Sequence, residues 1–523
     1  MGENTSRTGE ILSKKPGLLT RLRALWSDVL FPGEPAPSAP GTAVLVCEAI
    51  LVLAAGILSF TQLDCPLQEP EEALYAEVPR QMLAEHRLLA PVRHGQAYYD
   101  KPPLLYWLVM GMYRLCGIHD WAARFISSSA AFLCVLVTYA WGKRTVGPRA
   151  AFAGALMLSL SPRWAQMARM VSMNSLLTLW VVAALAAAHL ALARPRVSRR
   201  WWLLSALACG LGVLTKGPVA LVLVAAPTLL YQLLDRRAAR VGWGLWGTYL
   251  ALVGLIALPW FVVVAIRDPS FVYYFVWIHH FRRFLDPIDH WQPFWYYGPV
   301  LLLGMMPWAL LFPGLVKHVV GRMKQGVPHR TGDLGFFLLA GLWSLLFFSA
   351  AGCKRPCYVL PIMPPLTLAL GCYVDAACRL GRIRPAHWAC AASASFLLLL
   401  AAVQWLLPWY ADKYSVRGRI IPHVEACADG TPVMCYPHVW DGVSYYLRRN
   451  DVRVYRPAQL DEMVSALRSQ RQSLVVVEDA SLDRFLEALP ESLAFVPCGR
   501  QHPVVVGWVR QRQGLVDPVS FVP

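Results

Sequence analysis

Residues 42–83 read TAVLVCEAILVLAAGILSFT, then QLDCPLQEP, then EEALYAEVPRQML. The first run carries one charged side chain, Glu48, and has the length of about 20 residues that a helix needs to cross a bilayer. The second run is a polar loop, and the third opens with two glutamates. This order predicts a helix that crosses the membrane, followed by acidic side chains at one face of the membrane.

Long apolar runs of this kind recur along the chain. Of its 523 residues, 56% are apolar, and they gather in runs instead of alternating with polar residues as the strands of a membrane barrel do. The sequence therefore predicts an all-α polytopic membrane protein. The twelve candidate segments are 42–61, 103–117, 121–141, 149–161, 172–193, 201–214, 217–234, 243–265, 295–316, 334–351, 357–377 and 386–408.

Five groups of basic residues lie between these segments, and the positive-inside rule assigns such groups to the cytoplasm. All five groups lie on the cytoplasmic side only if segment 103–117 does not cross the membrane. This segment is short and follows Lys101-Pro102, so we expect it to lie in the outer interface. About eleven crossings remain, in a range of about 11–13 helices, and the chain ends outside. The groups are Lys143/Arg144/Arg149, Arg196/Arg199/Arg200, Arg236/Arg237/Arg240, Lys317/Arg322/Lys324/Arg330 and Arg379/Arg382/Arg384.

These arguments divide the chain into three parts. Residues 1–40 have no small-residue cleavage site beside a short apolar core, and we expect them to form a cytoplasmic tail. Residues 41–408 form the transmembrane domain, with 62–120 as its first outer loop. Residues 409–523 have ordinary composition and predict a small α/β domain outside the membrane. Its expected strands are 432–436, 452–455, 473–478 and 504–509, and its expected helices are 441–449, 460–469 and 481–489.

The formal charge of +17 does not indicate a nucleic-acid partner, because the basic residues act as topology signals between apolar runs. His279, His280 and His290 lack the spacing of metal ligands. We therefore predict no metal and no cofactor.

The start of the acidic helix has a physical reason. Pro70 suits the first helical position, and Glu71 and Glu72 stand in the first turn, where the helix dipole favours an anion. Adjacent helical residues point about 100° apart, so one glutamate acts and the other supports it. Leu74, Val78 and Met82 form an apolar stripe that suits a helix lying on a membrane surface. From these residues alone, the favoured interpretation is that the acids are simply good first-turn residues on a solvated helix.

A resemblance favours the catalytic interpretation. The run Glu71-Glu72-Ala73-Leu74-Tyr75-Ala76-Glu77 is similar to the Asp-Glu-x-x-Tyr-Ala-Glu signature of bacterial glycosyltransferases related to protein O-mannosyltransferases and the lipid A aminoarabinose transferase (ArnT-like), members of the GT-C superfamily. At the family's distance follows Tyr98-Tyr99-Asp100-Lys101-Pro102-Pro103-Leu104-Leu105-Tyr106-Trp107, which resembles the family's Tyr-Phe-Glu-Lys-Pro-Pro-x-x-Tyr-Trp. Further matches extend the resemblance over about residues 60–365. They are 122–124, 168–169, 214–218, 279–284, 292–297 and 354–361.

The sequence departs from the family pattern at three positions. The leading acid, usually Asp, is Glu71, and the Arg before the family's Tyr is Leu74. The second outer-loop acid, usually Asp, is Asn174, which cannot ionise. Glu71 must then act alone or with Glu72, Glu77 or Asp100.

The resemblance implies transfer of a sugar from a polyprenyl phosphate, a reaction that needs a carboxylate for the acceptor's proton and cations for the leaving phosphate. The expected catalytic acids are Glu71, Glu72 and Glu77. The expected phosphate ligands are Lys101 and Lys354 first, then Arg124, Lys216 and Arg283; snorkelling to the interface is the alternative for each. The expected cavity residues are Tyr75, Tyr98, Tyr99, Asp100, Asn174, His279 and Tyr358.

The predicted function is a glycosyltransferase of the bacterial inner membrane with its site facing the periplasm. Its partners are a polyprenyl-phosphate sugar donor, a lipid, protein or glycan acceptor, and the membrane lipids. Two alternatives remain. A lipid or sugar transporter would show internal repeats, and none is visible. A catalytically inactive relative with a lipid-binding or scaffold role is compatible with Asn174 and Glu71.

Overall fold

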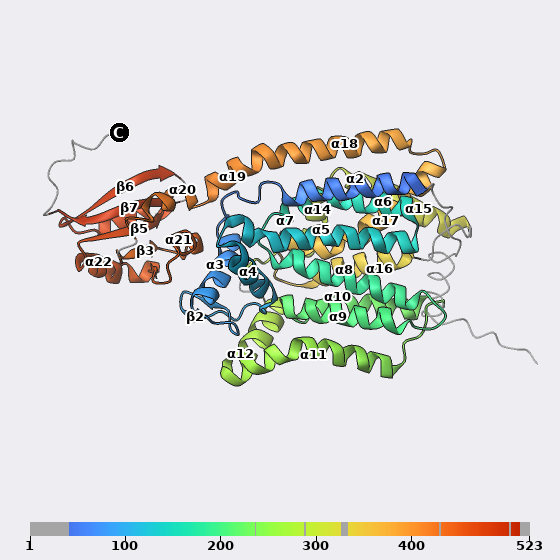
Figure 1. Ribbon diagram of the computed structural model, residues 1–523, viewed down its shortest axis with the longest axis horizontal. Coiled ribbons are helices and arrows are strands. Elements are labelled where there is room, and N and C mark those ends of the chain that lie inside the picture. Colours follow the sequence, from blue (N-terminus) through green and yellow to red (C-terminus); the bar gives the residue numbers. More distant parts are fainter. Residues whose placement is uncertain are drawn as a thin grey trace, which may run out of the picture.

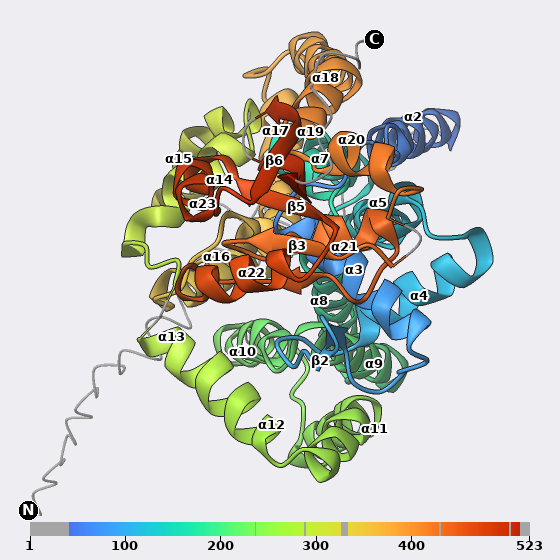
Figure 2. The same cartoon turned by 90° about the vertical axis from the view of Figure 1, so that its left-hand side faces the viewer.

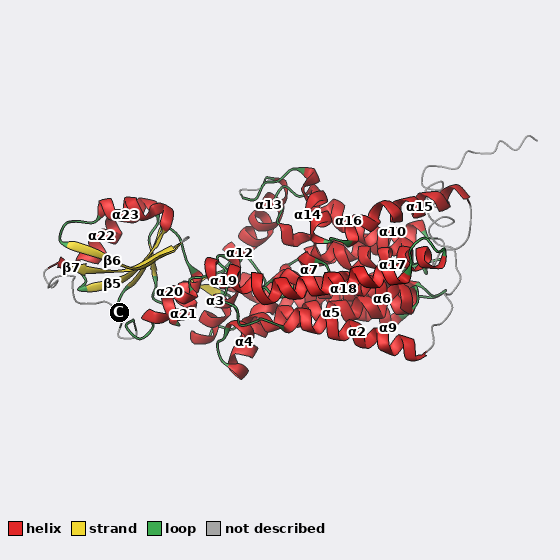
Figure 3. Ribbon diagram, turned by 90° about the horizontal axis from the view of Figure 1, so that it is seen from above, coloured by secondary structure: helices red, strands yellow, loops and turns green. Residues whose placement is uncertain are grey.

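The computed structural model describes residues 41–235, 237–286, 289–325, 333–427, 430–501 and 504–512. A long helical bundle fills most of the molecule, and a small domain with a β-sheet stands at one end of its longest axis (Figure 1). Within these described ranges, strands occur only in this domain and in one short hairpin (Figure 3). The expected tail 1–40 lies outside the described residues.

The bundle consists of α-helices with short 3-10 and π-helical segments, and most of these elements run along its long axis (Figure 1). They are α2 (Gly41–Phe60), α5 (Asp120–Thr145), α6 (Pro148–Ser159), α7 (Pro162–Met167), α8 (Met173–Leu192), α9 (Arg199–Lys216), α10 (Val219–Leu234), α11 (Trp243–Arg267), α14 (Tyr297–Gly304), η3 (Trp308–Leu311), α15 (Phe312–Gln325), α16 (Leu334–Ala350), η4 (Pro356–Ile362), α17 (Met363–Arg379), α18 (Pro385–Ala401), η5 (Ala402–Leu406) and α19 (Leu407–Tyr414).

Six helical segments of the described chain have the length and composition of membrane spans, and the bent pair Phe294–Gly304 and Trp308–Gly321, which turns by 108°, would be a seventh. They coincide with predicted segments. Other predicted spans form shorter helices, such as the 12-residue α6, which at 1.5 Å per residue is about 18 Å long. That these shorter segments cross the membrane remains a prediction. The six are Ala43–Phe60, Asp120–Thr145, Met173–Leu192, Trp243–Arg267, Pro356–Arg379 and Pro385–Tyr414.

The connections with basic clusters gather at one end of the bundle. The links from α8 to α9, from α10 to α11 and from α17 to α18 lie at the end opposite the C-terminal domain (Figure 1). This shared end is what the positive-inside argument requires. Arg236 and Arg330 lie outside the described residues.

The first outer loop folds at the other end. It contains α3 (Glu71–Ala84), a hairpin of β1 (Val92–Arg93) and β2 (Gln96–Ala97), and α4 (Leu104–Cys116). With 13 residues, α4 is too short to cross the hydrocarbon core of about 30 Å. This agrees with the prediction that segment 103–117 does not span.

Two details of α3 differ from the prediction. Pro70 caps the helix, which begins at Glu71. Val78 and Met82 are fully buried, so their stripe does not lie on a membrane surface. It packs inside the protein because α3 is held between α4 and α21 of the C-terminal domain.

A segment with a π-helix, η1 (Tyr273–Arg282), follows α12 (Ser270–Val272) and ends in α13 (Arg283–Leu285). Figure 2 views the molecule from the end that carries the C-terminal domain, and it shows α11 and α12 at one edge and α18 at the opposite edge. The short η2 (Phe294–Tyr296) then leads into α14.

The C-terminal domain is the predicted α/β unit. Its sheet has the order β4-β3-β5-β7-β6; β3 is parallel to β4 and β5, whereas β7 is antiparallel to β5 and β6. The strand β6 was not predicted, because Pro497 interrupts its pattern; a register shift follows at this residue. The elements are α20 (Arg417–Ile420), η6 (Ile421–His423), β3 (Val433–Tyr436), α21 (Asp441–Leu447), β4 (Arg453–Val454), η7 (Pro457–Gln459), α22 (Leu460–Arg468), β5 (Gln472–Glu478), η8 (Asp479–Ser481), α23 (Leu482–Ala488), β6 (Leu493–Gln501) and β7 (Val504–Gln511).

Buried polar contacts fix this domain to the outer loop. Arg93 on β1 forms an ion pair of 2.7 Å with Asp441, the first residue of α21. The side chain of Glu69 accepts a hydrogen bond of 2.6 Å from the backbone N–H of Gly442. Although burial would raise the pKa of Asp441, hydrogen bonds from His94 and Arg93 hold it below its usual range. The domain therefore bears directly on the loop that carries the acidic motif.

Candidate active site

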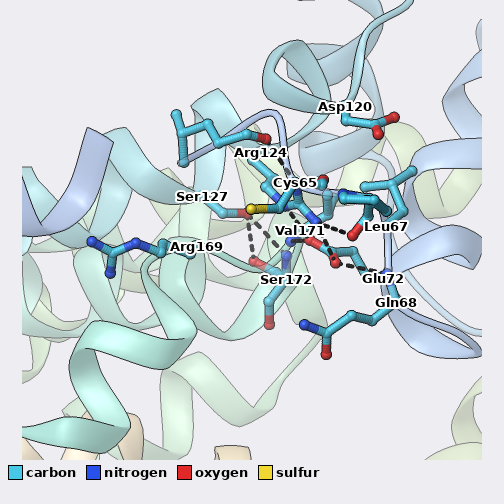
Figure 4. A network of polar contacts seen from close by, with 12 residues as sticks. Cys65, Leu67, Gln68, Glu72, Asp120, Arg124, Ser127, Arg169, Val171 and Ser172 are labelled. Carbon is cyan, nitrogen blue, oxygen red and sulfur yellow. Dashed lines mark hydrogen bonds and ion pairs between the residues drawn. The ribbon is translucent and has the colours of Figure 1, made fainter. Parts of the chain in front are cut away.

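The three predicted acids of α3 have three different environments. Glu72 is buried, and both its oxygens bind Arg124, at 2.7 and 2.8 Å. The same carboxylate accepts hydrogen bonds of 3.0 Å from the backbone N–H groups of Gln68 and Val171 (Figure 4). A buried carboxylate that accepts four hydrogen bonds has no lone pair left for a substrate. Glu72 therefore holds the loop in place.

Arg124 is saturated in the same network. Besides Glu72, it donates to the backbone carbonyls of Leu63, Cys65 and Pro66, and only 3% of the residue is exposed. Its five N–H groups are thus engaged, and the structure removes Arg124 from the predicted phosphate ligands. Sequence reasoning could not separate it from the other outer cations, because a basic residue at a helix start has the same pattern in either role.

Glu77 is also committed to the fold. It forms two hydrogen bonds with Arg80, at 2.6 and 2.7 Å, and accepts a third from Gln81 at 2.7 Å. Arg80 continues to the side chain of Asn450 in the C-terminal domain. Burial raises the pKa of Glu77, against the opposing effect of Arg80. Glu77 and Arg80 therefore link α3 to the C-terminal domain.

Glu71 remains the accessible acid of the three. Its side chain is 34% exposed and forms an ion pair with Arg355, which is 26% exposed. Arg355 stands in the loop between α16 and η4, in the predicted motif 354–361, but it was not singled out from the sequence. Its position beside Lys354 in that motif was the available signal.

Three of the predicted phosphate ligands converge on one cavity of about 140 Å³. Lys101 comes from the loop before α4, Lys216 from the end of α9, and Arg283 from the start of α13. Among the described residues, no carboxylate lines this cavity. Three positive charges in one partly enclosed space form a site for a polyanion such as a phosphate. The other lining residues are Val219, His279, His280, Phe284, Phe347, Phe348, Ala351, Cys353 and Tyr358.

Lys101 is held from two sides. Its Nζ atom donates to the carbonyl of Asp100 at 3.0 Å and lies 2.8 Å from Nε2 of His279. Burial, with the positive charges of Lys216 and Arg283, lowers the pKa of Lys101 to about 7. Burial and the charge of Lys101 lower the pKa of His279 to about 2, so this imidazole is neutral and accepts the hydrogen bond.

Lys216 contacts the residue that replaces the family's second acid. Its Nζ atom donates to Oδ1 of Asn174 at 2.5 Å and lies 4.2 Å from the ring centre of Tyr358. Asn174 in turn donates to Ser172 at 3.0 Å. An amide neutralises no charge. Burial lowers the pKa of Lys216 to about 8, so its ammonium form predominates at pH 7 and is available to an anion.

Arg283, the first residue of α13, is the third cation that lines the cavity. Its guanidinium contacts Asp289 at 3.1 Å and Sγ of Cys353 at 3.4 Å. The exposed Asp289 offsets part of its charge.

Lys354 does not line this cavity. Its Nζ atom donates to the carbonyl of Gln292 at 2.8 Å and to that of Ala351, and only 4% of the residue is exposed. It joins the loop 351–358 to the segment before α14. The structure therefore assigns Lys354 to the support of the cavity wall and leaves Lys101, Lys216 and Arg283 as the converging cations.

One of the predicted cavity tyrosines, Tyr98, contacts the predicted cavity residue Asp100. Tyr98 and Tyr274 both hydrogen-bond to the Asp100 carboxylate, and Tyr274 was not singled out from the sequence. Burial and the charge of Asp100 raise the pKa of Tyr98. Tyr99 packs against Phe271, with ring centres 5.2 Å apart, and hydrogen-bonds to Asp268. Tyr75 is buried beside Tyr106.

Comparisons with known proteins show which families the chain resembles. Residues 100–266 match the family described as dolichyl-phosphate-mannose-protein mannosyltransferase. The chain is 36% identical over 365 residues to undecaprenyl phosphate-alpha-4-amino-4-deoxy-L-arabinose arabinosyl transferase 1 of Sodalis glossinidius, covering 67% of this chain and 63% of the relative. It is 34% identical over 316 residues to the transferase of the same description from Edwardsiella ictaluri, covering 59% and 56%. The chain thus spans somewhat more than half the length of these relatives.

Solved structures show the same fold. ArnT from Cupriavidus metallidurans, crystallised with bound undecaprenyl phosphate, has a TM-score of 0.73 at 20% identity and covers 90% of this chain and 98% of its own. The mycobacterial arabinofuranosyltransferase AftD has a TM-score of 0.52 at 17% identity, covering 92% and 40%. The resemblance predicted from the two outer-loop motifs is confirmed: the chain is a multi-spanning membrane protein that is similar in sequence to a mannosyltransferase family and to the arabinosyl transferases, and similar in fold to ArnT.

Proposed function

We propose that this chain transfers a sugar from a polyprenyl-phosphate donor to an acceptor at the outer face of the membrane. The observation that carries the proposal is the convergence of Lys101, Lys216 and Arg283 on one cavity without a lining carboxylate. The donor's phosphate is an anion that such a cavity accommodates, and the apolar bundle beside it suits the polyprenyl chain. The names of the relatives give undecaprenyl phosphate as the lipid and 4-amino-4-deoxy-L-arabinose as the sugar, and we propose the same donor class here.

In the proposed reaction an acceptor oxygen attacks the anomeric carbon. The bond between this carbon and the phosphate oxygen breaks, and the electron pair leaves with the lipid phosphate. Lys101, Lys216 and Arg283 stabilise the charge on this leaving group. The acceptor's proton passes to Glu71, the one acid of the three predicted on α3 that is not enclosed by the fold.

The neutral Asn174 supports a second candidate, a donor-binding relative without transfer activity. With an amide in this position, a mechanism with two carboxylates has only Glu71 and the tyrosine-bound Asp100 to draw on. Both candidates predict donor binding, and only the first predicts turnover.

The decisive experiment uses the full chain in liposomes with radiolabelled undecaprenyl-phosphate aminoarabinose. Lipid A, an acceptor peptide and a glycan are offered in separate reactions. We expect label to appear in the lipid fraction and to be lost in Glu71→Gln, whereas both proteins bind the donor. Binding without transfer to any of the three acceptors would establish the second candidate instead.

A further inference from the structure

A second cavity lies far from the candidate active site, at the end of the bundle where the basic connections gather. Its volume is about 500 Å³, within the range of small-molecule sites. Four helices and the end of a fifth enclose it: α2, α6, α17, α18 and α5. The residues with a role below are Val44, Arg149, Phe152, Asp375, Arg379 and Trp388.

The cavity opens between helices at the periphery of the bundle. Along α18 only Ala392 and Ser395 are buried, and α18 and α2 lie side by side at one edge of the bundle (Figure 2). In the apolar stretch of Ala43–Phe60, 28% of the residues are buried inside the protein. In the apolar stretch of Pro385–Tyr414, 17% are buried. The surrounding medium of these helices is lipid, so an occupant can enter sideways from the bilayer.

The charges around the cavity leave one cation unmatched. Asp375 pairs with Arg379 at 2.6 Å, and Glu48 beside Tyr139 pairs with Lys143. Arg149 is exposed and has no hydrogen bond or ion pair among the residues described. A guanidinium is well suited to hold a phosphate through two N–H groups.

A buried donor without a partner points to the same occupant. The Nε1 atom of Trp388 is buried, and within the described chain it has no hydrogen-bond acceptor. Its indole packs edge-on against Phe152, with ring centres 6.0 Å apart, and both rings line the cavity. An unpaired N–H at such a site costs stability unless a ligand supplies an acceptor.

We propose that this groove binds one anionic phospholipid from the membrane leaflet at that end of the bundle. Its phosphate is held by Arg149, its ester or headgroup oxygen accepts from Trp388, and an acyl chain packs along Phe152 and Val44. The single unmatched charge of Arg149 matches the single charge of a phosphatidylglycerol phosphate. Basic sites between membrane helices that bind acidic headgroups follow the same physics.

The test is native mass spectrometry of the full chain released from nanodiscs with equal phosphatidylglycerol and phosphatidylethanolamine. We expect wild type to retain phosphatidylglycerol preferentially. Arg149→Ala should lower the retained fraction about tenfold, as expected for loss of a charge-assisted contact. Trp388→Phe keeps the ring without its N–H and should lower retention about threefold.

The matched control is Arg240→Ala, which removes an exposed arginine at the same end of the bundle and should leave retention unchanged. Thermal unfolding of each variant verifies that it is folded. Equal retention in Arg149→Ala and Arg240→Ala would overturn the proposal, as would equal retention of the two lipids by wild type. A chain without residues 1–40 that retains more phosphatidylglycerol than the full chain would show that this segment occupies the groove instead.

Discussion

Nζ of Lys101 lies 2.8 Å from Nε2 of His279, although 178 residues separate them in the chain. The contact joins the outer loop before α4 to η1. Because burial lowers the pKa of His279 to about 2, the imidazole is neutral and stabilises the ammonium as a hydrogen-bond acceptor only. The ammonium form of Lys101 can therefore bind a donor phosphate. The protein lowers the pKa of this group to about 7, so it loses its proton easily.

Donor binding should depend on pH through Lys101. A phosphate binds the ammonium form, so affinity should be full below pH 7 and fall as the pH rises above the pKa of the free protein. Lys101→Arg stays charged throughout, so its affinity should stay flat through pH 7 and fall only as the pH approaches 8, the lowered pKa of the buried Lys216 in the same cavity. The measurement is titration calorimetry with undecaprenyl phosphate in micelles. Identical pH profiles for wild type and Lys101→Arg would exclude Lys101 as the titrating group.

Lys101 should also destabilise the ligand-free fold. Its pKa is lower in the folded state than in the unfolded state, so the unfolded chain binds more protons from about pH 7 to 10.4. The stability of wild type should therefore rise with pH across this window. Lys101→Met should raise the melting temperature at pH 7 and flatten this slope, while it weakens donor use about ten- to a hundredfold. A lower melting temperature in Lys101→Met would contradict this account.

The adjacent glutamates of α3 should give opposite results. Glu71→Gln should fold and bind donor normally, and its transfer rate should fall by about 10²–10⁴-fold, because it loses the proposed base. Glu72→Gln leaves Arg124 buried without its counter-charge, so the free energy of unfolding should drop by about 3 kcal/mol or more. Transfer assays and thermal melts of both variants check this pair. Near wild-type turnover of Glu71→Gln would refute its assignment as the base.

Lys216 and Lys354 should differ in their effect on the donor. Lys216 lines the cationic cavity, and Lys216→Met should raise the donor KM about tenfold or more. Lys354 binds backbone carbonyls, and Lys354→Met should chiefly lower the melting temperature. Asn174→Asp should also raise the donor KM, because a carboxylate at this distance would neutralise Lys216. Faster transfer by Asn174→Asp would instead mean that the reaction lacks a second acid.

The orientation in the membrane can be checked with impermeant thiol reagents. After replacement of the exposed Cys116, Cys390 and Cys498, single cysteines are placed at exposed positions. Arg87→Cys and Glu487→Cys should react from outside, whereas Arg196→Cys and Arg240→Cys should react only after the membrane is permeabilised. Labelling of Glu487→Cys from the cytoplasmic side alone would reverse the proposed topology.

The sequence was sufficient to predict a helical membrane fold with a small C-terminal α/β domain, and it singled out the outer loop that carries the candidate site. Apolar runs that are long enough to cross a bilayer as helices predict a helical bundle. The basic clusters between them predict which connecting loops lie on the same side of the membrane. The four predicted strands of the C-terminal domain were found, because alternating strand and helix patterns are local properties. The two motifs of the outer loop indicated the family, and they also placed Lys101 and Glu71 in one loop.

Only the tertiary structure decided which charges are free. Glu71 and Glu72 are neighbours with the same chemistry, yet one is open and the other is enclosed by Arg124 and two backbone N–H groups. Lys216 and Lys354 likewise look alike in sequence. Their roles differ because only Lys216 lines the cavity. Hydrogen-bond partners from distant segments set these differences, and a local pattern carries no record of which distant segments meet.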